Sequence, residues 1–555
     1  MNTLDFIVLI AYFILITGFG IWISKKIKTS DSYFRGDRKF KWYIMIGQAF
    51  GVGTHAEMPV AQTGATFSNG FATIWYQWKN MLITPFYWLL APFYRRSERT
   101  TVGEIIEDRY GNNMGLAYSI FAIAFFVFSM GVMLQGAAKV ISVASGNQFS
   151  PNMIVLFMTV AFILYSFIGG LIAAAYTDFI QSFLIIILSI LLIPLGLIEV
   201  GGFHSMRSSL PDYFFDVFNS RSGIDAFTIA MLAVNGIVGI TAQPHMVSMC
   251  ATGNTERAGR IGQTFGSFVK RLITIGWALT GLVVATLVIK TGVELPDPEM
   301  AFGHACSVLL MPGLVGLMLA AILAANMSSC SNFMVNTGAL FTRNVYRKYM
   351  KPEASDRRLL WVGRYSGLIL ALLAVLFALG VRNVLHAFLF VETLAAFMGI
   401  IFLGGLLWKR ANRYGAATAV IVSVSVYYIA NYLATGRLML VYKWEAEPFG
   451  LAMLSGFFIF WLVSILTRPE DKERIESFFD NMRRKSDAEE PGPEGIKPLA
   501  SDTGEDLLLL DIPGYGKHER WKGFFKRYRE DLAGFAISWI VVGLLILLAW
   551  GIMQI

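Results

Sequence analysis

Residues 324–336, AANMSSCSNFMVN, place hydroxyl and amide side chains inside a long apolar run. On a helix, Ala325, Ser328, Ser329 and Asn332 fall on one face because three or four residues separate them. Two consecutive hydroxyls beside a backbone carbonyl could supply the hard oxygen ligands that an alkali cation needs. Small polar residues also serve close helix packing and interhelical hydrogen bonds in membranes, so the stripe alone leaves both interpretations open.

Two apolar runs contain residues that interrupt a helix. The run at 44–64 holds Gly51, Gly53 and Pro59, and a later run ends in GITAQPHMV, which contains Pro244. Gly and Pro weaken or break helices. Backbone carbonyls freed at membrane depth are tolerated only where they are buried in protein or face a wet cavity or an ion. The two interrupted runs therefore predict a binding site.

A lysine lies inside another apolar run. Lys79, in WYQWKNM, carries a charge that costs several kcal/mol at membrane depth unless it is paired. We expect an internal ion pair with Glu57, which would make Lys79 structural. The alternative is that Lys79, together with His55 or His245, attracts an anionic solute such as a small carboxylate.

The elements that must position these residues are membrane helices. The chain has 555 residues, of which 55% are hydrophobic and 15% charged, and its mean hydropathy is +0.57. Such values are typical of a membrane protein. About fourteen apolar runs are long enough to cross roughly 30 Å of hydrocarbon as helices. We predict an all-α membrane protein with spans at 4–24, 40–66, 71–95, 115–143, 151–169, 171–200, 225–246, 268–292, 300–345, 359–380, 383–408, 414–434, 448–467 and 533–554.

The first run and the basic residues predict the topology. The run at 4–24 lacks a basic flank and a cleavage site, so we expect a spanning helix rather than a signal peptide. The net charge of +8 comes from Lys and Arg between spans, not from one stripe with interleaved aromatics, which argues against a nucleic-acid partner. The positive-inside rule makes the basic clusters cytoplasmic and places both termini outside. We expect a multi-pass protein of the plasma membrane, the inner membrane of a bacterium. The Cys and His residues show neither disulfide nor metal-ligand spacing.

The spacing of the spans divides the chain into two sets of five. Spans two to six and seven to eleven each begin with an interrupted helix, as inverted-repeat transporters do. The predicted organisation is a leading helix and basic loop (1–39), a first repeat (40–200), an extracellular loop (201–223), a second repeat (224–410), two accessory spans (411–468), a cytoplasmic segment (469–532) and a last span (533–555). In the cytoplasmic segment, ERIESFFDNMRR is amphipathic. Trp521, Phe524 and Phe525 among basic residues predict a helix on the lipid headgroups.

Four stretches of the chain resemble the sodium:solute symporters, which include sodium/glucose, sodium/proline and pantothenate transporters. They are TSDSYFRGDRKFKW, RTTVGEIIEDRYG, YSFIGGLIAAAYTDFIQ and AANMSSCSNFMVNTGALFTRNVY, and the resemblance runs from the first span to about residue 410. The fold that it implies is the LeuT-like five-plus-five inverted repeat with additional helices.

The resemblance also implies ligands for Na⁺. The family's shared sodium site uses backbone carbonyls of the broken second span and of span nine, together with two consecutive hydroxyls of span nine. In this sequence the carbonyls fall on Gly51, Thr54 and Ala325, and the hydroxyls fall on Ser328 and Ser329. Asp178, in AAAYTDFIQ, matches an acidic residue near the family's sodium path; the alternative is a capping or interfacial carboxylate.

The implied solute contacts are Glu57, Gln77, Asn80, Gln243 and Lys270, and Lys79 lies beside Asn80 in the sequence. The sequence departs from sugar transporters, since Met58 replaces an amide and Ala242 a polar residue. A sugar is therefore not the expected solute.

Together these features predict a sodium-coupled symporter that imports a small polar organic solute across the plasma membrane by alternating access. Na⁺ would be the coupling ion, with no organic cofactor; the partners would be the solute and the bilayer, with no obligatory protein partner. An enzyme is not expected, because no catalytic constellation converges in the spans. Two alternatives stay open: a proton-coupled transporter of the same fold, and a solute-sensing receptor without net transport.

Overall fold

The computed structural model describes residues 2–24, 40–53, 57–99, 101–483, 508–512, 521 and 523–555. Within these ranges all regular elements are helices. Isolated β-bridges also occur, such as that between Phe40 and Gly253. They are α1 (Thr3–Ser24), α3 (Trp42–Gly53), α4 (Glu57–Asn69), η2 (Phe71–Ile74), α5 (Trp75–Arg96), α6 (Val102–Tyr110), α7 (Asn112–Ala144), α8 (Pro151–Val200), α9 (Gly202–Ser209), η3 (Asp212–Phe215), η4 (Ser220–Ser222), α10 (Ala226–Thr241), α11 (Met246–Ala251), α12 (Glu256–Thr291), η5 (Pro298–Met300), α13 (Ala301–Leu309), α14 (Leu314–Leu340), η6 (Phe341–Met350), α15 (Asp356–Gly380), α16 (Val384–Leu407), α17 (Arg413–Thr435), α18 (Ala446–Leu466), α19 (Lys472–Arg483), α20 (Phe524–Arg527) and α21 (Arg529–Gln554).

One of the two predicted helix interruptions is confirmed. In the second span the described helices are α3 and α4; residues 54–56 between them lie outside the described residues, so the first interruption stays a prediction. The seventh span divides into α10 and α11, and Pro244 lies in the gap between them. Proline has no N–H to donate and clashes with the preceding turn, which accounts for the second interruption.

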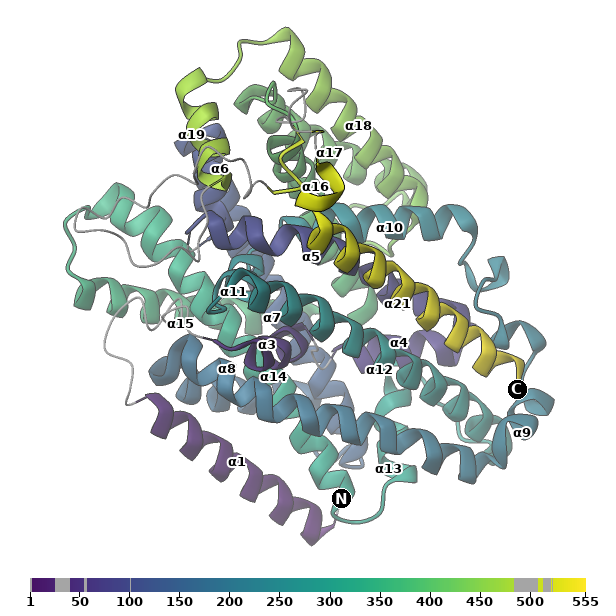
Figure 1. Cartoon of the computed structure of the whole chain (residues 1–555). Helices are drawn as coiled ribbons and strands as arrows, with labels where there is room; N and C mark the ends of the chain where they lie inside the picture. The colour runs from purple at the N-terminus through teal and green to yellow at the C-terminus, as the bar shows by residue number, and fades with distance from the viewer. Residues whose placement is uncertain are drawn as a thin grey trace.

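Equivalent helices of the two predicted sets pack against helices of the other set or its counterpart in similar ways. Helices α3 and α4 of the first set pack on α12 of the second, and α10 and α11 of the second set pack on α5 of the first. The third helices behave alike, since α7 packs on α15 and α16 while α14 packs on α8 (Figure 1). This reciprocal exchange is what an inverted repeat produces, because equivalent elements of the two halves then have equivalent neighbours.

Two predicted boundaries differ from the structure. The span predicted at 300–345 is two helices, α13 and α14, because Pro312 precedes Gly313, whose φ of +88° cannot continue a helix. Conversely, the spans predicted at 151–169 and 171–200 form one helical element, α8, of 50 residues. Gly169 and Gly170 permit a turn between spans without imposing one, since both keep their backbone N–H.

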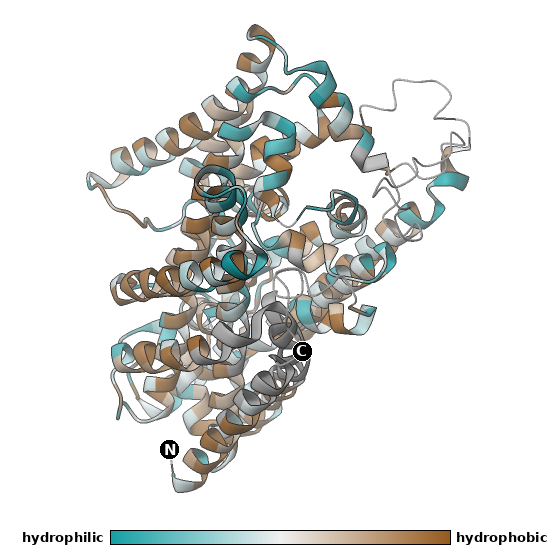
Figure 2. Cartoon of the chain, turned by 90° about the vertical axis from the view of Figure 1, so that its left-hand side faces the viewer, coloured by the Kyte–Doolittle hydropathy of each residue, from teal (hydrophilic) through white to brown (hydrophobic). Residues whose placement is uncertain are grey.

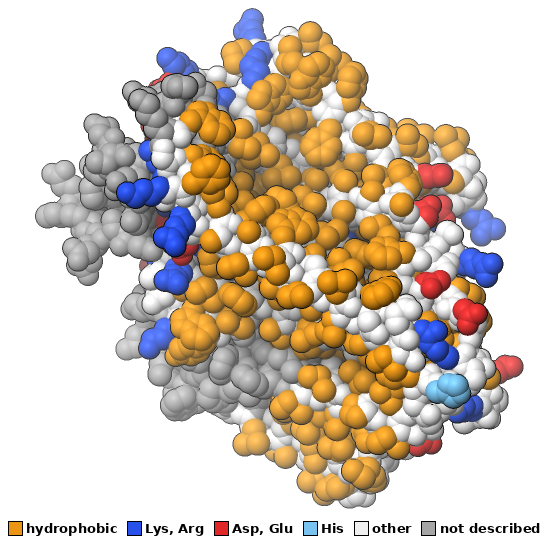
Figure 3. Space-filling model, turned by 45° about the vertical axis from the view of Figure 1, so that its right-hand side comes forward, with side chains coloured by type: hydrophobic (Ala, Val, Ile, Leu, Met, Phe, Trp, Pro, Cys, Tyr) orange, Lys and Arg blue, Asp and Glu red, His pale blue; other side chains and the backbone are white. Residues whose placement is uncertain are grey.

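The outer surface is that of a membrane protein. Within the described residues, seven helices are long and apolar enough to cross a membrane, or eight if the bent pair Ile187–Val200 and Gly202–Ser209 is one span. The predicted count of fourteen stays a prediction. The long helices are largely hydrophobic in Figure 2. In Figure 3 a broad apolar face separates Lys and Arg at one margin from acidic and basic residues at the other.

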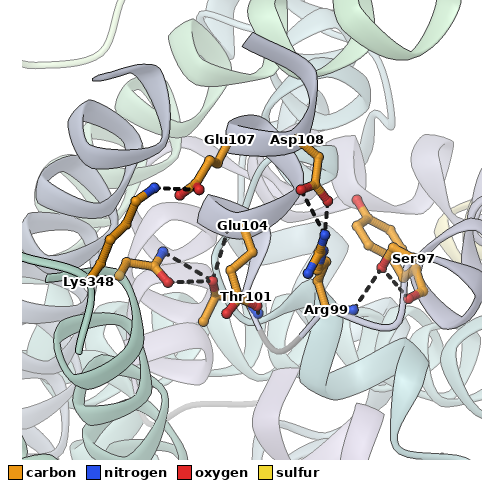
Figure 4. A network of polar contacts seen from close by, with 9 residues as sticks. Ser97, Arg99, Thr101, Glu104, Glu107, Asp108 and Lys348 are labelled. Atoms are coloured by element: carbon orange, nitrogen blue, oxygen red, sulfur yellow. Dashed lines mark hydrogen bonds and ion pairs between the residues drawn. The ribbon is translucent and has the colours of Figure 1, made fainter. Parts of the chain in front are cut away.

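The two ends of the bundle carry different elements. Both termini lie at the end that contains α9 and α13 (Figure 1), where Leu4 contacts Gly313 and Arg207 donates to the carbonyl of Met553. At the other end α6 joins η6, which is a π-helix, through an ion pair between Glu107 and Lys348 (Figure 4). The same network holds α6 to the preceding loop.

The cytoplasmic segment is partly described. The predicted amphipathic stretch forms α19, which packs on α5 and α6 and buries Phe478 and Phe479. Of the predicted headgroup helix, the described residues include the four-residue α20, and Phe525 in α20 and Trp521 before it are exposed. Residues 484–507, 513–520 and 522 lie outside the described residues.

Candidate functional site

A cavity of about 70 Å³ is lined by residues of the second and seventh predicted spans. Glu57, the first residue of α4, and Gln243 and His245, in the interruption between α10 and α11, all line it. Its other polar residues are Asn80, Ser129, Gln263, Ser267, Lys270, Arg271 and Glu392. Its apolar wall includes Met58, Phe125, Met133, Met246, Phe333 and Phe388. The cavity thus combines an apolar lining with a few convergent polar groups, as binding sites for small molecules do.

Of the six residues predicted to contact solute, four line this cavity: Glu57, Asn80, Gln243 and Lys270. The other two, Gln77 and Lys79, are buried behind its wall. The Nε2 of Gln77 donates a hydrogen bond of 2.7 Å to the carbonyl of Met58. Gln77 therefore fixes the first turn of α4, which carries Glu57.

The predicted partner of Lys79 was wrong. Lys79 is fully buried and forms an ion pair with Glu392 of α16, not with Glu57. Its Nζ also donates a hydrogen bond of 2.6 Å to Oδ1 of Asn235 in α10. The expectation that a charge at this depth must be paired is confirmed, but the carboxylate belongs to α16, in the second set of helices, and is far from Lys79 in the sequence.

Sequence reasoning missed Glu392 and Arg271. Nδ2 of Asn80 donates 3.2 Å to Glu392 Oε1, so α5, α10 and α16 share one polar network. Nη1 of Arg271 donates 3.0 Å to the carbonyl of Gln77, which ties α12 to α5. A usable signal for Glu392 was present, since it is a lone carboxylate within the apolar run FLFVETLAAF.

The predicted sodium ligands lie on elements that pack together. Helix α3, which contains Gly51, packs on α14, which contains Ala325, Ser328 and Ser329 (Figure 1). Ser329 is fully buried. Thr54 lies outside the described residues. The side chains of Ala325, Ser328 and Asp178 are also outside them, and for Gly51, as for Asp178 in α8, the structure describes the helix to which the residue belongs. The ligand set stays a prediction.

The rest of the polar stripe in α14 serves in part for packing. Nδ2 of Asn326 donates 2.9 Å to the carbonyl of Met133 in α7, and Asn336 donates to the carbonyl of Asn332 one turn earlier. His245 lies against Phe125 and Phe333, with ring centroids 6.2 and 5.3 Å away. His55, the other titratable candidate, lies outside the described residues. Across the described ranges no three His, Cys, Asp or Glu residues are grouped to hold a metal.

Known proteins share this architecture. The structure of a Na⁺-coupled sialic acid symporter, in a substrate-bound outward-open state, matches with a TM-score of 0.70 at 18% identity and covers 84% of this chain and 99% of that one. Mhp1, a nucleobase-cation-symport-1 family transporter, matches with a TM-score of 0.52 at 12% identity over 81% of this chain and 99% of its own. These likenesses show the LeuT-like fold.

Sequence comparison extends the likeness to a family. The osmoregulated proline transporter OpuE of Bacillus subtilis is 29% identical over 494 residues, which are 84% of this chain and 96% of the relative. The sodium/glucose cotransporter of Vibrio parahaemolyticus is 23% identical over 76% of this chain and 84% of the relative. A model of the sodium:solute symporter family matches residues 33–423. The chain belongs to the sodium:solute symporter family, whose members are transporters and not enzymes.

Proposed function

We propose that this protein is a sodium-coupled symporter that imports a small polar organic solute across the plasma membrane by alternating access. The observation that carries the proposal is the position of the cavity. It lies between α4 and the interruption that separates α10 from α11, and both sets of helices contribute to its wall. A ligand there contacts both halves of the protein, so it can favour one arrangement of the halves over the other.

The coupling ion is Na⁺, held by the carbonyls of Gly51, Thr54 and Ala325 and the hydroxyls of Ser328 and Ser329, with Asp178 near its path. Packing of α3 on α14 supports this assignment. So does the full burial of Ser329, because a hydroxyl in a dry environment replaces the water that the ion loses. Binding of Na⁺ joins the two sets of helices beside the cavity.

The solute binds in the cavity against Glu57, Asn80, Gln243 and Lys270. Gln77 and Lys79 do not contact the solute directly. They position residues of the cavity wall, Gln77 by its hydrogen bond to Met58 and Lys79 by its ion pair with Glu392. The sodium gradient is sufficient as an energy source. One charge moving down 100 mV supplies about 2.3 kcal/mol, and a tenfold ion gradient adds about 1.4 kcal/mol. The sum corresponds to accumulation of roughly several hundredfold.

The test is solute uptake into proteoliposomes under an imposed Na⁺ gradient or an imposed H⁺ gradient. Uptake driven by Na⁺ and not by H⁺ is expected. The double variant Ser328→Ala/Ser329→Ala should need a higher Na⁺ concentration for half-maximal uptake. The matched control is Ser331→Ala, because Ser331 is equally buried on the same helix and its Oγ has no hydrogen-bond partner.

The outcomes separate the alternatives. Uptake that follows only the H⁺ gradient would establish the proton-coupled transporter instead. Solute binding without uptake under either gradient would indicate a receptor. An unchanged Na⁺ dependence in the double variant would overturn the sodium site while leaving the coupling itself in place.

A further inference from the structure

The cavity has an unusual wall on α12. Lys270 and Arg271 are consecutive, both line the cavity, and their exposed fractions are only 5% and 4%. A buried charge is costly unless a counter-charge or hydrogen bonds compensate it. Arg271 is compensated in part, since Nη1 donates to the carbonyl of Gln77 while Nε has no partner. The Nζ of Lys270 forms neither a hydrogen bond nor an ion pair with any residue in the described parts of the chain, although its backbone carbonyl accepts a hydrogen bond from Thr274.

The described carboxylates around the cavity do not balance these cations. Among the described residues, Glu57 and Glu392 are the carboxylates that line it, and Glu392 already pairs with Lys79 and accepts a hydrogen bond from Asn80. With that pair set aside, Lys270 and Arg271 remain beside one carboxylate, Glu57. The described part of the site therefore carries one more positive than negative charge, and its uncommitted donor is the ammonium of Lys270.

We infer that the solute is a small organic anion with a single carboxylate, which binds to the Nζ of Lys270. This inference rests on the proposed function and names the solute class of that same cavity. A monocarboxylate supplies the one negative charge that the cavity lacks, and hydrogen bonds between charged groups are about twice as strong as neutral ones. Phe333, Phe388 and Met246 offer an apolar surface for the rest of the solute.

Two further features agree with this solute class. The cavity of about 70 Å³ suits a compact molecule with few heavy atoms. Lys79, the cation that the sequence singles out, is not available to a solute, because Glu392 and Asn235 occupy its Nζ. Lys270 lies on a different helix and faces the cavity itself.

The experiment compares acids with their uncharged analogues. Purified full-length protein in Na⁺ is titrated with propionate, pyruvate and L-lactate, with propionamide and lactamide, and with L-proline and D-glucose, and binding is followed by calorimetry and thermal shift. At least one acid should bind and its amide should not. Lys270→Met should weaken binding of that acid about tenfold or more, and Lys270→Arg should retain most of the affinity.

The control variant is Lys290→Met, because Lys290 is an exposed lysine at the far end of the same helix. Its affinity for the acid should equal that of the wild type. If Lys270→Met does not fold, Lys270→Gln replaces it, since glutamine keeps a donor but not the charge. Equal binding of acid and amide, or an affinity for the acid that Lys270→Met and Lys270→Gln leave unchanged, would overturn the inference.

Uptake of the bound acid into proteoliposomes separates this inference from the proposed function. Uptake of the acid under a Na⁺ gradient supports both. Na⁺-driven uptake of L-proline or D-glucose without binding of any acid overturns the solute class and leaves the symporter. Binding of an acid that is never taken up under a Na⁺ gradient supports the solute class and overturns the symporter.

Discussion

At the scale of single residues, the buried ion pair of Lys79 and Glu392 sets the geometry of the cavity wall. Lys79 lies where α5 and α10 touch so closely that a Cβ on Gly236 would be 2.5 Å from the carbonyl oxygen of Lys79. Nζ then reaches Asn235 and Glu392, so that one ammonium connects three helices. We infer that this buried pair fixes the relative positions of the three helices rather than adding stability, because apolar side chains of similar volume often stabilise a core equally well.

Removing one member of this pair should be more harmful than removing both. Lys79→Met leaves the Glu392 carboxylate buried and unpaired, which costs about 3 to 5 kcal/mol. The double variant Lys79→Met/Glu392→Met should recover most of the loss. The measurement is the thermal midpoint of purified protein by tryptophan fluorescence. A double variant as unstable as Lys79→Met alone would contradict this explanation and assign the loss to packing.

The same residues show what the sequence could predict. Local chemistry identified the helix interruption at Pro244, since proline acts on its own backbone. It also identified Lys79 as a charge that needs a partner. The partner itself could not be predicted, because Glu57 is near in sequence whereas Glu392 is near only after α5, α10 and α16 have packed. Contacts between distant elements depend on the packing of the whole bundle.

At the scale of elements, Glu470 joins the start of α17 to α19. Its carboxylate accepts hydrogen bonds from the backbone N, Nε and Nη2 of Arg413 at 2.8, 2.9 and 2.6 Å. Arg474 of α19 lies 3.6 Å away. Burial acts to raise the pKa of Glu470, but the hydrogen bonds and charge of Arg413 and the charge of Arg474 outweigh it and hold the pKa below its ordinary value.

The lowered pKa of Glu470 predicts a pH dependence of stability. A carboxyl with a depressed folded-state pKa stabilises the protein fully above its unfolded-state pKa, about 4.3 for Glu, and the stabilisation is lost as the pH falls through the folded-state pKa. Glu470→Gln should therefore lower the thermal midpoint at pH 7 and pH 5 alike. The difference from wild type should shrink below about pH 4.

The control for this prediction is Glu473→Gln, since Glu473 is exposed in the first turn of the same α19. Its thermal midpoint should follow that of the wild type at every pH. A stability difference for Glu470→Gln that stays constant down to pH 3 would show that the charge of Glu470 is not what holds α17 and α19.

At the scale of the whole molecule, each end of the bundle has ion pairs that join separate elements, and we call each of these groups a latch. At the end with the termini, Lys139 of α7 contacts Asp297 at 2.8 Å and Glu299 at 2.5 Å. Glu299 also accepts the backbone N–H groups of Val384 and Leu385 at the start of α16. At the other end the latch is the pair of Glu107 and Lys348 in Figure 4. Alternating access requires one end to open while the other stays closed.

Breaking the latches should shift this balance in opposite directions. Lys139→Met should increase labelling of Ser267→Cys in the cavity by a membrane-impermeant maleimide added outside, and Lys348→Met should decrease it. The first effect should be larger, because the Lys139 pair is buried whereas Lys348 is 25% exposed, and exposed pairs contribute only about 1 kcal/mol or less. The native cysteines are buried, so the parent protein provides the background.

Equal labelling rates in the parent carrying Ser267→Cys and in both latch variants would contradict this assignment. The expected result, an increase for Lys139→Met and a decrease for Lys348→Met, would identify the end that holds the termini as the outer one. That result would also test the predicted topology, because the reagent reaches only one side of the membrane.

The shared cavity wall has a practical consequence for splitting the gene. Glu57 and Asn80 come from the first set of helices, while Gln243 and Glu392 come from the second. The chain between the sets passes through Ser220 and Arg221, which are exposed. Two fragments cut at that point would each hold half of a pocket, so their reassembly should tighten when the transported compound is added. A split reporter fused across the cut would then turn the protein into a sensor for its own cargo.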